Sequence, residues 1–339
     1  INLGDLYGDC QANENTIESY NEFRVQWTAG EMEAIGNTIN STDSYGIYLN
    51  SVDGKTYANE NTIDSDSEGI YVYTGYGDIQ VNDNTLNSTG SSGVYIGNYG
   101  YAHVEVNGNT INCYSDAIYV SNAYAGFEAN ENTITSQNGI GIDVSWSGGY
   151  VITNDNNITS YNRGIEISDA DNYLWINGNT INSTNSYGIY VGDCGYGAEV
   201  KDNKIVRSYN DGIYIDLQGG LAYVGYNLVN STSSCGIYLN DAYGPAVIEH
   251  NNVYSYNEGI MPENIYSTLV IRNNNITTIN DDGINFCDDI YSNLTITGNN
   301  INSPYDCIDW DASPGDYDVY GNIVINENKG IAEAARNIP

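Results

Sequence analysis

The sequence predicts a right-handed three-sheet parallel β-helix, an all-β solenoid of about 14 coils of 22–25 residues. Three observations lead to this prediction. An Asn followed two residues later by an aliphatic residue recurs at that spacing, a Gly-Ile-Tyr element follows most of these Asn residues, and two alternating apolar residues precede them. The right hand of the solenoid is expected from the general preference of parallel crossovers.

The Asn repeat defines the coil. Each amide is expected to stack on the same position of the next coil, so that the side chains hydrogen-bond along the axis as a ladder. The predicted ladder residues are Asn15, Asn37, Asn61, Asn84, Asn109, Asn132, Asn156, Asn179, Asn203, Asn227, Asn251, Asn274, Asn299 and Asn322.

The Gly-Ile-Tyr element, as in Gly46-Ile47-Tyr48, predicts a strand with its Ile inward and its Tyr outward. Stacked aromatic residues on adjacent strands stabilise a sheet by about 0.2–1 kcal/mol per pair. The outward Tyr ladder is predicted to contain Tyr48, Tyr71, Tyr95, Tyr119, Tyr190, Tyr214 and Tyr238.

The third strand of each coil precedes the Asn, with apolar residues five and three positions upstream, such as Ile79 and Val81. Three strands in a coil of this length exclude a propeller blade, which needs about 40 residues, and the Leu-rich consensus of leucine-rich repeats is absent. Because one coil cannot bury its apolar face alone, coils about 4.8 Å apart are expected to share one core.

The domain prediction is one β-helix over 1–331, starting and ending in the same coil phase, and a short tail over 332–339. Ile1 aligns on Ile237, and the chain is expected to return to this phase at Gly330-Ile331. No coil is expected to carry an insertion of more than a couple of residues. Two explanations are open: further repeats of a longer chain, or a head-to-tail homopolymer.

The net charge of the chain limits the classes of partner that it is expected to bind. The net charge is −35 with only 9 Lys and Arg, which disfavours nucleic acid and anionic membranes and suits divalent cations or a cationic partner. No apolar run approaches the roughly 20 residues that span a bilayer. No signal peptide is visible, so a secreted protein would be present here in mature form or as an excised piece.

The segments NGNTIN and GIYL resemble the repeats of pectin-lyase-like right-handed β-helix proteins, including NosD-like copper-processing proteins and many archaeal and bacterial surface proteins. The resemblance covers nearly the whole chain and implies the same fold. It implies no single function, because that superfamily includes lyases, hydrolases, epimerases, tailspikes and adhesins.

An acidic row is the candidate cation site. Glu258, Asp282 and Asp306 occupy equivalent positions on consecutive coils, and Asp281, Asp288, Asp289, Asp309 and Asp311 lie near them in sequence. Stacked carboxylates repel one another unless they are protonated or bind metal, and calcium prefers such oxygen ligands. A solvated turn is the alternative.

Asp281-Asp282-Gly283-Ile284 also resembles the Asp pair of polygalacturonase-type hydrolases, without counterparts of that family's Gly-His-Gly or Arg-Ile-Lys motifs. His103 and His250 lie about six coils apart and cannot share a metal, which weakens a copper role. Each is expected to be an exposed strand or turn residue.

Cys10 and Cys113 fall in inward positions, and a disulfide between Cys287 and Cys307 is left open. Sequons predict N-glycosylation, and four of them share one slot of the coil, which would align glycans along one edge. The sequon residues are Asn40, Asn87, Asn157, Asn182, Asn230, Asn275 and Asn293.

Taken together, regular coils and the lack of a catalytic constellation favour an extracellular or cell-surface structural protein, a subunit of a filament, sheath or surface layer or the stalk of an adhesin, assembling end to end. No catalytic residue and no required cofactor are predicted, and calcium is the one candidate ion. The alternative is a polysaccharide lyase, a glycoside hydrolase or a polysaccharide-binding module.

Overall fold

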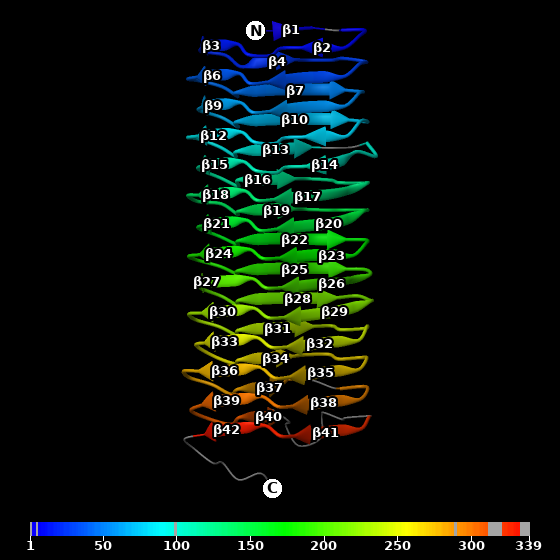
Figure 1. Cartoon of the computed structure of the whole chain (residues 1–339), viewed down its shortest axis with the longest axis vertical. Helices are drawn as coiled ribbons and strands as arrows, with labels where there is room; N and C mark the ends of the chain where they lie inside the picture. Colours follow the sequence, from blue (N-terminus) through cyan, green and yellow to red (C-terminus); the bar gives the residue numbers. More distant parts are fainter. Residues whose placement is uncertain (1, 5, 98–99, 288–289, 311–320, 333–339) are drawn as a thin grey trace. The chain divides into compact units, whose positions relative to one another are not determined.

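The computed structural model describes residues 2–4, 6–97, 100–287, 290–310 and 321–332. The chain forms two compact units, Ile1–Asp171 (unit 1) and Asn172–Pro339 (unit 2). In each unit the coils stack one beneath the next, and each coil contributes one strand to each of three parallel sheets (Figure 1). The predicted three-sheet parallel β-helix is therefore confirmed.

In unit 1, sheet A consists of β1 (Asn2–Leu3), β4 (Phe23–Val25), β7 (Ile47–Val52), β10 (Ile70–Gly75), β13 (Val94–Gly97), β16 (Ile118–Val120), β19 (Ile142–Val144) and β22 (Ile165–Ala170). Sheet B consists of β2 (Cys10–Gln11), β5 (Met32–Ile35), β8 (Thr56–Asn59), β11 (Ile79–Gln80), β14 (His103–Glu105), β17 (Gly126–Asn130) and β20 (Tyr150–Asn154). Sheet C consists of β3 (Thr16–Ser19), β6 (Thr38–Ser41), β9 (Thr62–Ser65), β12 (Thr85–Ser88), β15 (Thr110–Cys113), β18 (Thr133–Ser136) and β21 (Asn157–Ser160).

In unit 2, sheet A consists of β25 (Ile189–Cys194), β28 (Ile213–Leu217), β31 (Ile237–Asn240), β34 (Ile260–Pro262), β37 (Ile284–Phe286) and β40 (Ile308–Trp310). Sheet B consists of β23 (Leu174–Asn177), β26 (Gly197–Lys201), β29 (Leu221–Gly225), β32 (Ala246–Glu249), β35 (Leu269–Arg272), β38 (Leu294–Thr297) and β41 (Ile323–Asn326). Sheet C consists of β24 (Thr180–Ser183), β27 (Lys204–Ser208), β30 (Leu228–Ser231), β33 (Asn252–Ser255), β36 (Asn275–Thr278), β39 (Asn300–Ser303) and β42 (Lys329–Ala332).

The core of each unit follows from the period-two pattern of its strands. In unit 1, Ile47, Ile70 and Val94 pair in register and are fully buried, as are Ile213 and Ile237 in unit 2. Burying one such side chain contributes about 1.5–3 kcal/mol. Because most coils add one apolar residue to each inward row of a strand, the core of a unit is a continuous and mainly apolar column.

The corner between sheets B and C has the same backbone conformation in every described coil. The residue just before the ladder Asn has a positive φ, as at Glu60 (58°), Glu131 (58°) and Gly108 (67°). This left-handed conformation costs a non-Gly residue about 1–2 kcal/mol, and the corner uses mainly Gly, Asp, Glu and Asn. The ladder amide follows this residue directly, so the conformation turns that side chain into the corner.

The prediction for the last coil was wrong. Asn322 is exposed and bonds to Asn293 through its backbone N and its Nδ2, whereas Asn328 accepts from the Asn299 backbone N and Nδ2 at 2.9 Å each. The ladder spacing there is 29 residues, because the chain carries extra residues between β40 and β41. Gly330 and Ile331 consequently pair in sheet C and not in sheet A, where β1 lies, so the predicted common phase is not found.

None of the described residues forms a helix that is long and apolar enough to cross a membrane. Residues 333–339 of the predicted tail, together with Asp288, Asp289 and Asp311 of the acidic segment, lie outside the described residues.

Candidate functional site

The Asn ladder is the most regular polar feature of the molecule. Asn109 donates through Nδ2 to the carbonyl oxygens of Val81 at 2.8 Å and Asn107 at 3.0 Å, and to Asn132 Oδ1 at 3.0 Å. Its own Oδ1 accepts from the Asn84 N and Nδ2 at 2.9 Å each. The amide thus satisfies backbone groups that the corner would otherwise bury without partners.

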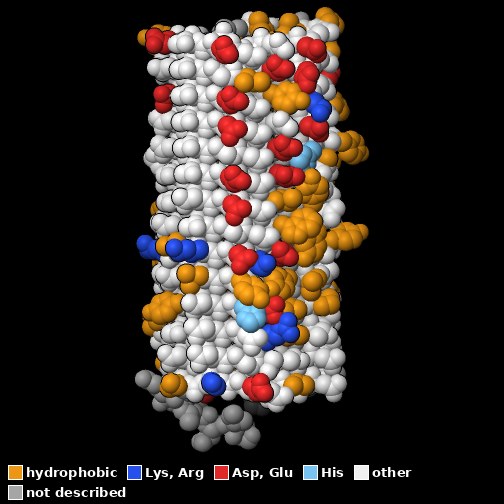
Figure 2. Space-filling view, viewed as in Figure 1, with side chains coloured by type: hydrophobic (Ala, Val, Ile, Leu, Met, Phe, Trp, Pro, Cys, Tyr) orange, Lys and Arg blue, Asp and Glu red, His pale blue; other side chains and the backbone are white. Residues whose placement is uncertain are grey.

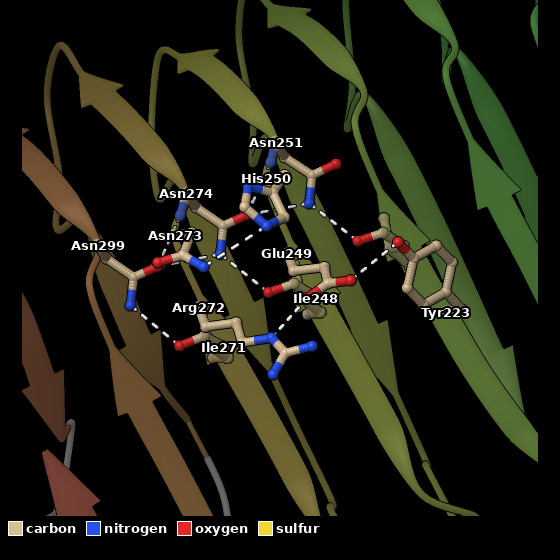
Figure 3. Close-up of polar contacts among 11 residues, drawn as sticks. Tyr223, Ile248, Glu249, His250, Asn251, Ile271, Arg272, Asn273, Asn274 and Asn299 are labelled. Carbon is tan, nitrogen blue, oxygen red and sulfur yellow. Dashed lines mark hydrogen bonds and ion pairs between the residues drawn. The ribbon is translucent and has the colours of Figure 1, made fainter.

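Unit 2 repeats this arrangement, as Figure 3 shows for three consecutive coils. Asn251, Asn274 and Asn299 each donate Nδ2 to a carbonyl oxygen, those of Val224, Ile248 and Ile271, at 2.9–3.0 Å. Asn251 and Asn274 also donate to the Oδ1 of the next ladder residue at 3.0 Å. The predicted ladder positions from Asn15 to Asn156 in unit 1 and from Asn179 to Asn299 in unit 2 have this buried or corner position, so Asn322 alone is wrong.

The predicted Tyr ladder is present on sheet A. In unit 1 the ring centroids of Tyr48 and Tyr71 are 5.0 Å apart, and those of Tyr71 and Tyr95 are 4.8 Å apart, with the planes within 7°. Burial, followed by the neighbouring Tyr residues, raises the pKa of Tyr71 to about 12. In unit 2, Tyr190 and Tyr214 stack at 4.9 Å.

The ladder ends differently in the two units. In unit 1, Arg24 covers the Tyr48 ring at 4.8 Å. In unit 2, Tyr238 meets Tyr214 edge to face at 80°, because its hydroxyl donates to the Glu263 carboxylate. The Tyr238 ring therefore departs from the stacking of the rings before it.

Sequence reasoning missed an acidic group that continues the Tyr row of unit 1. Asp143 pairs with Tyr119 on one side and with Glu166 on the other. Burial, then the charges of Glu166 and Asp116, raise the pKa of Asp143 to about 7, against a smaller opposing effect of Arg163. Glu166 also accepts hydrogen bonds from Arg163 and Ser168. The signal in the sequence was the replacement of Tyr by acid in two successive coils.

The predicted calcium row is in register, since the Gly259 N bonds to the Asp282 carbonyl and the Gly283 N to the Asp306 carbonyl. The carboxylates, however, have protein partners. Asp282 Oδ1 accepts from the Asp306 backbone N at 2.7 Å, and Glu258 Oε2 accepts from the Cys235 thiol at 3.0 Å. Burial, followed by neighbouring acids, raises the pKa of Asp282 to about 6 against the lowering effect of this backbone bond.

Two further coils use the same bond. Asp116 Oδ1 accepts from the Ile140 N at 2.8 Å and Asp211 Oδ1 from the Cys235 N at 3.0 Å. Asp at this slot therefore caps the backbone of the next coil. Within the described residues, no three His, Cys, Asp or Glu side chains come close enough together to hold a metal ion. Calcium binding stays a prediction.

The two His residues lie in different units, and His103 is half-buried where an exposed residue was expected. Its Nδ1 is 3.5 Å from Glu105 and its Nε2 is 3.5 Å from Glu128 and 3.3 Å from the Tyr150 hydroxyl. His250 is exposed, as expected, and stacks on Tyr226 at 4.9 Å.

A cross-strand ion pair lies beside the ladder of unit 2 (Figure 3). The buried Glu249 on β32 accepts from the Tyr223 hydroxyl at 3.0 Å and from Arg272 Nε on β35. Burial raises the pKa of Glu249, but the hydrogen bonds from Arg272 and Tyr223 outweigh it and hold the pKa below its usual value. The group ties three successive coils of sheet B together.

The sequon residues lie on strands or corners, and several of their amides are engaged. Asn87 Nδ2 donates to Asp64 at 3.0 Å, Asn230 Nδ2 to the Val206 carbonyl at 2.9 Å, and Asn275 Nδ2 to Asn252 at 2.9 Å. Asn40 and Asn87 occupy the same outward row of sheet C, as expected from their shared slot. Glycosylation itself stays a prediction.

The cysteines have structural positions. Cys10 and Cys113 are buried, as expected. Cys307 is a free thiol, so the disulfide with Cys287 that the sequence left open is not formed. Burial, followed by the charges of Glu258 and Asp211, strongly raises the pKa of Cys235, which keeps this thiol protonated and unreactive.

Comparison with known families agrees with this geometry. The family described as "right handed beta helix region" matches residues 116–264 and 193–337. Neither the curated proteins nor the solved structures contain a match to the chain.

Proposed function

Because the chain belongs to the right-handed β-helix family, we propose that it is an extracellular or cell-surface structural protein, a solenoid subunit of a filament, sheath or surface layer or an adhesin stalk. The observation that carries the proposal is the translational repeat of its contacts. Each coil of a unit makes the same three strand pairings, the same amide bond and the same corner as the coil before it.

Such a repeat favours end-to-end assembly for a physical reason. Strands in a parallel sheet pair through backbone groups, which are the same in every coil and every copy. A ladder Asn offers one amide donor and one acceptor along the axis, so one copy can continue the pattern of another without new side-chain chemistry. Assembly by repeated heterologous contact gives an open filament.

The acidic positions that would suggest catalysis support the same view. Asp116, Asp211 and Asp282 each accept a hydrogen bond from a backbone N–H of the next coil through one carboxylate oxygen. These three are engaged in holding neighbouring coils together.

A polysaccharide-binding role is the second candidate, and an exposed aromatic row in unit 2 favours it. Tyr243, Tyr266 and Tyr291 stack at 4.4 and 4.9 Å and are 51%, 37% and 42% exposed. Tyr combines an apolar ring with a polar hydroxyl, a combination suited to sugars.

Negative-stain electron microscopy of the native protein tests the first proposal. Filaments, tubes or ordered sheets are expected. Discrete particles that do not associate at high concentration would contradict assembly. Cosedimentation with pectin, alginate or cellulose that is lost in Tyr243→Ala/Tyr266→Ala would then support the second candidate.

A further inference from the structure

Sheet C of unit 2 contains basic residues in an otherwise acidic chain. Its strands β24, β27, β30, β33, β36, β39 and β42 contain no Asp or Glu, in a protein with 44 acidic residues. Figure 2 shows a band of Lys and Arg side chains on a face that is otherwise mostly uncharged, with hydrophobic side chains beside the band. We define the basic bulge patch as Lys204, Val206, Arg207, Leu228 and Tyr254.

A β-bulge produces this patch. The register between β24 and β27 shifts after Ile181, and that between β27 and β30 shifts after Ile205. The extra residue turns both Val206 and Arg207 outward, while Ile205 and Ser208 stay buried. Asn230 Nδ2 donates to the Val206 carbonyl at 2.9 Å, which stabilises the bulge. Bulges that re-aim side chains are typical of functional positions.

The cations of the patch differ from most others in the chain. Arg24, Lys55, Arg163, Lys201 and Arg272 each have a carboxylate within 4.0 Å. For Lys204 and Arg207, no carboxylate of the described residues lies within that distance. Beside them, Val206 and Leu228 are 43% exposed and Tyr254 is 47% exposed. Exposed apolar side chains next to unpaired cations indicate a surface that a partner covers.

A complementary surface lies on sheet C of unit 1. A shallow hollow of about 240 Å³ is lined by residues that include Asn40, Thr42, Asp64, Asp66, Asn87 and Thr89. We call it the acidic hollow. Asp64 and Asp66 are exposed, and each accepts one neutral hydrogen bond, from Asn87 at 3.0 Å and from Thr89 at 3.2 Å. Among the described residues, no Lys, Arg or His pairs with either carboxylate.

We propose that the basic bulge patch of one copy docks into the acidic hollow of a second copy of this chain, joining copies side by side. The exposed cations of the patch are opposite in charge to the exposed Asp64 and Asp66 of the hollow, and neither set is paired with an opposite charge among the described residues. Arg207 can form a forked pair with a carboxylate, and Lys204 supplies a second charge. This lateral contact rests on the proposed structural function. It adds to end-to-end assembly a second contact, in which copies of the chain associate side by side.

Charge reversal tests the contact by sedimentation velocity at low ionic strength, where surface charges are least screened. Lys204→Glu/Arg207→Glu and Asp64→Lys/Asp66→Lys are each expected to weaken self-association at least about tenfold. An equimolar mixture of the two variants is expected to associate again, because the reversed patch meets the reversed hollow. Lys55→Glu/Lys201→Glu changes the net charge equally at cations that already have partners, and should associate like the parent protein.

Self-association of Lys204→Glu/Arg207→Glu at the parent level, or no recovery in the mixture, would overturn the proposal. A glycan on Asn40 or Asn87, detected by intact mass, would also overturn it, since it would cover the hollow. Microscopy separates this inference from the proposed function. Single filaments that no longer bundle in the patch variant support both ideas, whereas recovery in the mixture without any filaments supports the lateral contact alone.

Discussion

The ladder Asn shows how one residue type determines a coil. Asn has a short amide with both donors and an acceptor, so the same side chain can bond to a carbonyl of its own corner and to the amide of the next coil. Asp lacks the donor, and Gln is one methylene longer. This chemistry could be predicted from the sequence because the Asn recurs at a nearly constant spacing.

Asn109→Ala is expected to lower the free energy of unfolding by about 2–3 kcal/mol, because it removes the side-chain partners of the Val81 carbonyl and the Asn84 backbone N in a buried corner and one of the two hydrogen bonds to Asn132 Oδ1. Asn112→Ala, on the exposed face of β15 directly after this corner, should change it by no more than about 0.5 kcal/mol. Chemical denaturation measures both. Equal effects of the two substitutions would contradict a structural role for the ladder.

Asp143 predicts a pH dependence of stability. Its pKa is raised in the folded protein, so the folded state binds more protons than the unfolded state between about pH 4 and its pKa of about 7. This residue therefore destabilises the fold progressively as the pH rises through that window. Asp143→Asn should be more stable than the parent at pH 8 by on the order of 2 kcal/mol, and nearly equal to it at pH 4. A difference that does not change with pH would rule this out.

At the scale of the element, the strand pattern was predictable and the register of the last coil was not. Asn322 is followed two residues later by the aliphatic Val324, whereas Asn328 is followed by Gly330, so both the motif and the regular spacing favoured Asn322. The better signal was the corner residue: Asn326-Glu327-Asn328 matches Asn59-Glu60-Asn61, and both Glu residues have positive φ. The bulge in β27 was also missed, because one added residue lies within the ordinary variation of coil length.

The corrected register makes a prediction. Asn328→Ala removes the acceptor of the Asn299 N–H and the donor to the Ile296 carbonyl, and should destabilise the last coils of unit 2 by about 1–3 kcal/mol. Asn322→Ala, on an exposed turn, should have almost no effect. Hydrogen exchange at the Asn299 amide reports the difference locally. Faster exchange in Asn322→Ala than in Asn328→Ala would favour the register with Asn322 in the ladder.

At the scale of the whole molecule, the fold followed from the repeat and the function did not. Repetition identifies a solenoid because each coil depends on its neighbours, but solenoids of one architecture serve many functions. The candidate cation site shows the same limit. Its residues were correctly placed on consecutive coils, whereas their hydrogen-bond partners depend on side-chain directions that spacing alone does not give.

Calcium remains the ion to test. If the acidic row binds it, calcium chloride should raise the melting temperature above that in sodium chloride of equal ionic strength, and Asp282→Asn should abolish the difference. Equal melting temperatures in the two salts would contradict calcium binding at the acidic row. Calcium would then act only by screening the net charge of −35.

The most direct test of the structural proposal is X-ray fibre diffraction from oriented assemblies of the native protein. End-to-end stacking of coils places every strand across the fibre axis, so a meridional reflection near about 4.8 Å is expected. Aligned assemblies without a meridional reflection at this spacing would show that copies do not continue one another's coils, and would contradict the account.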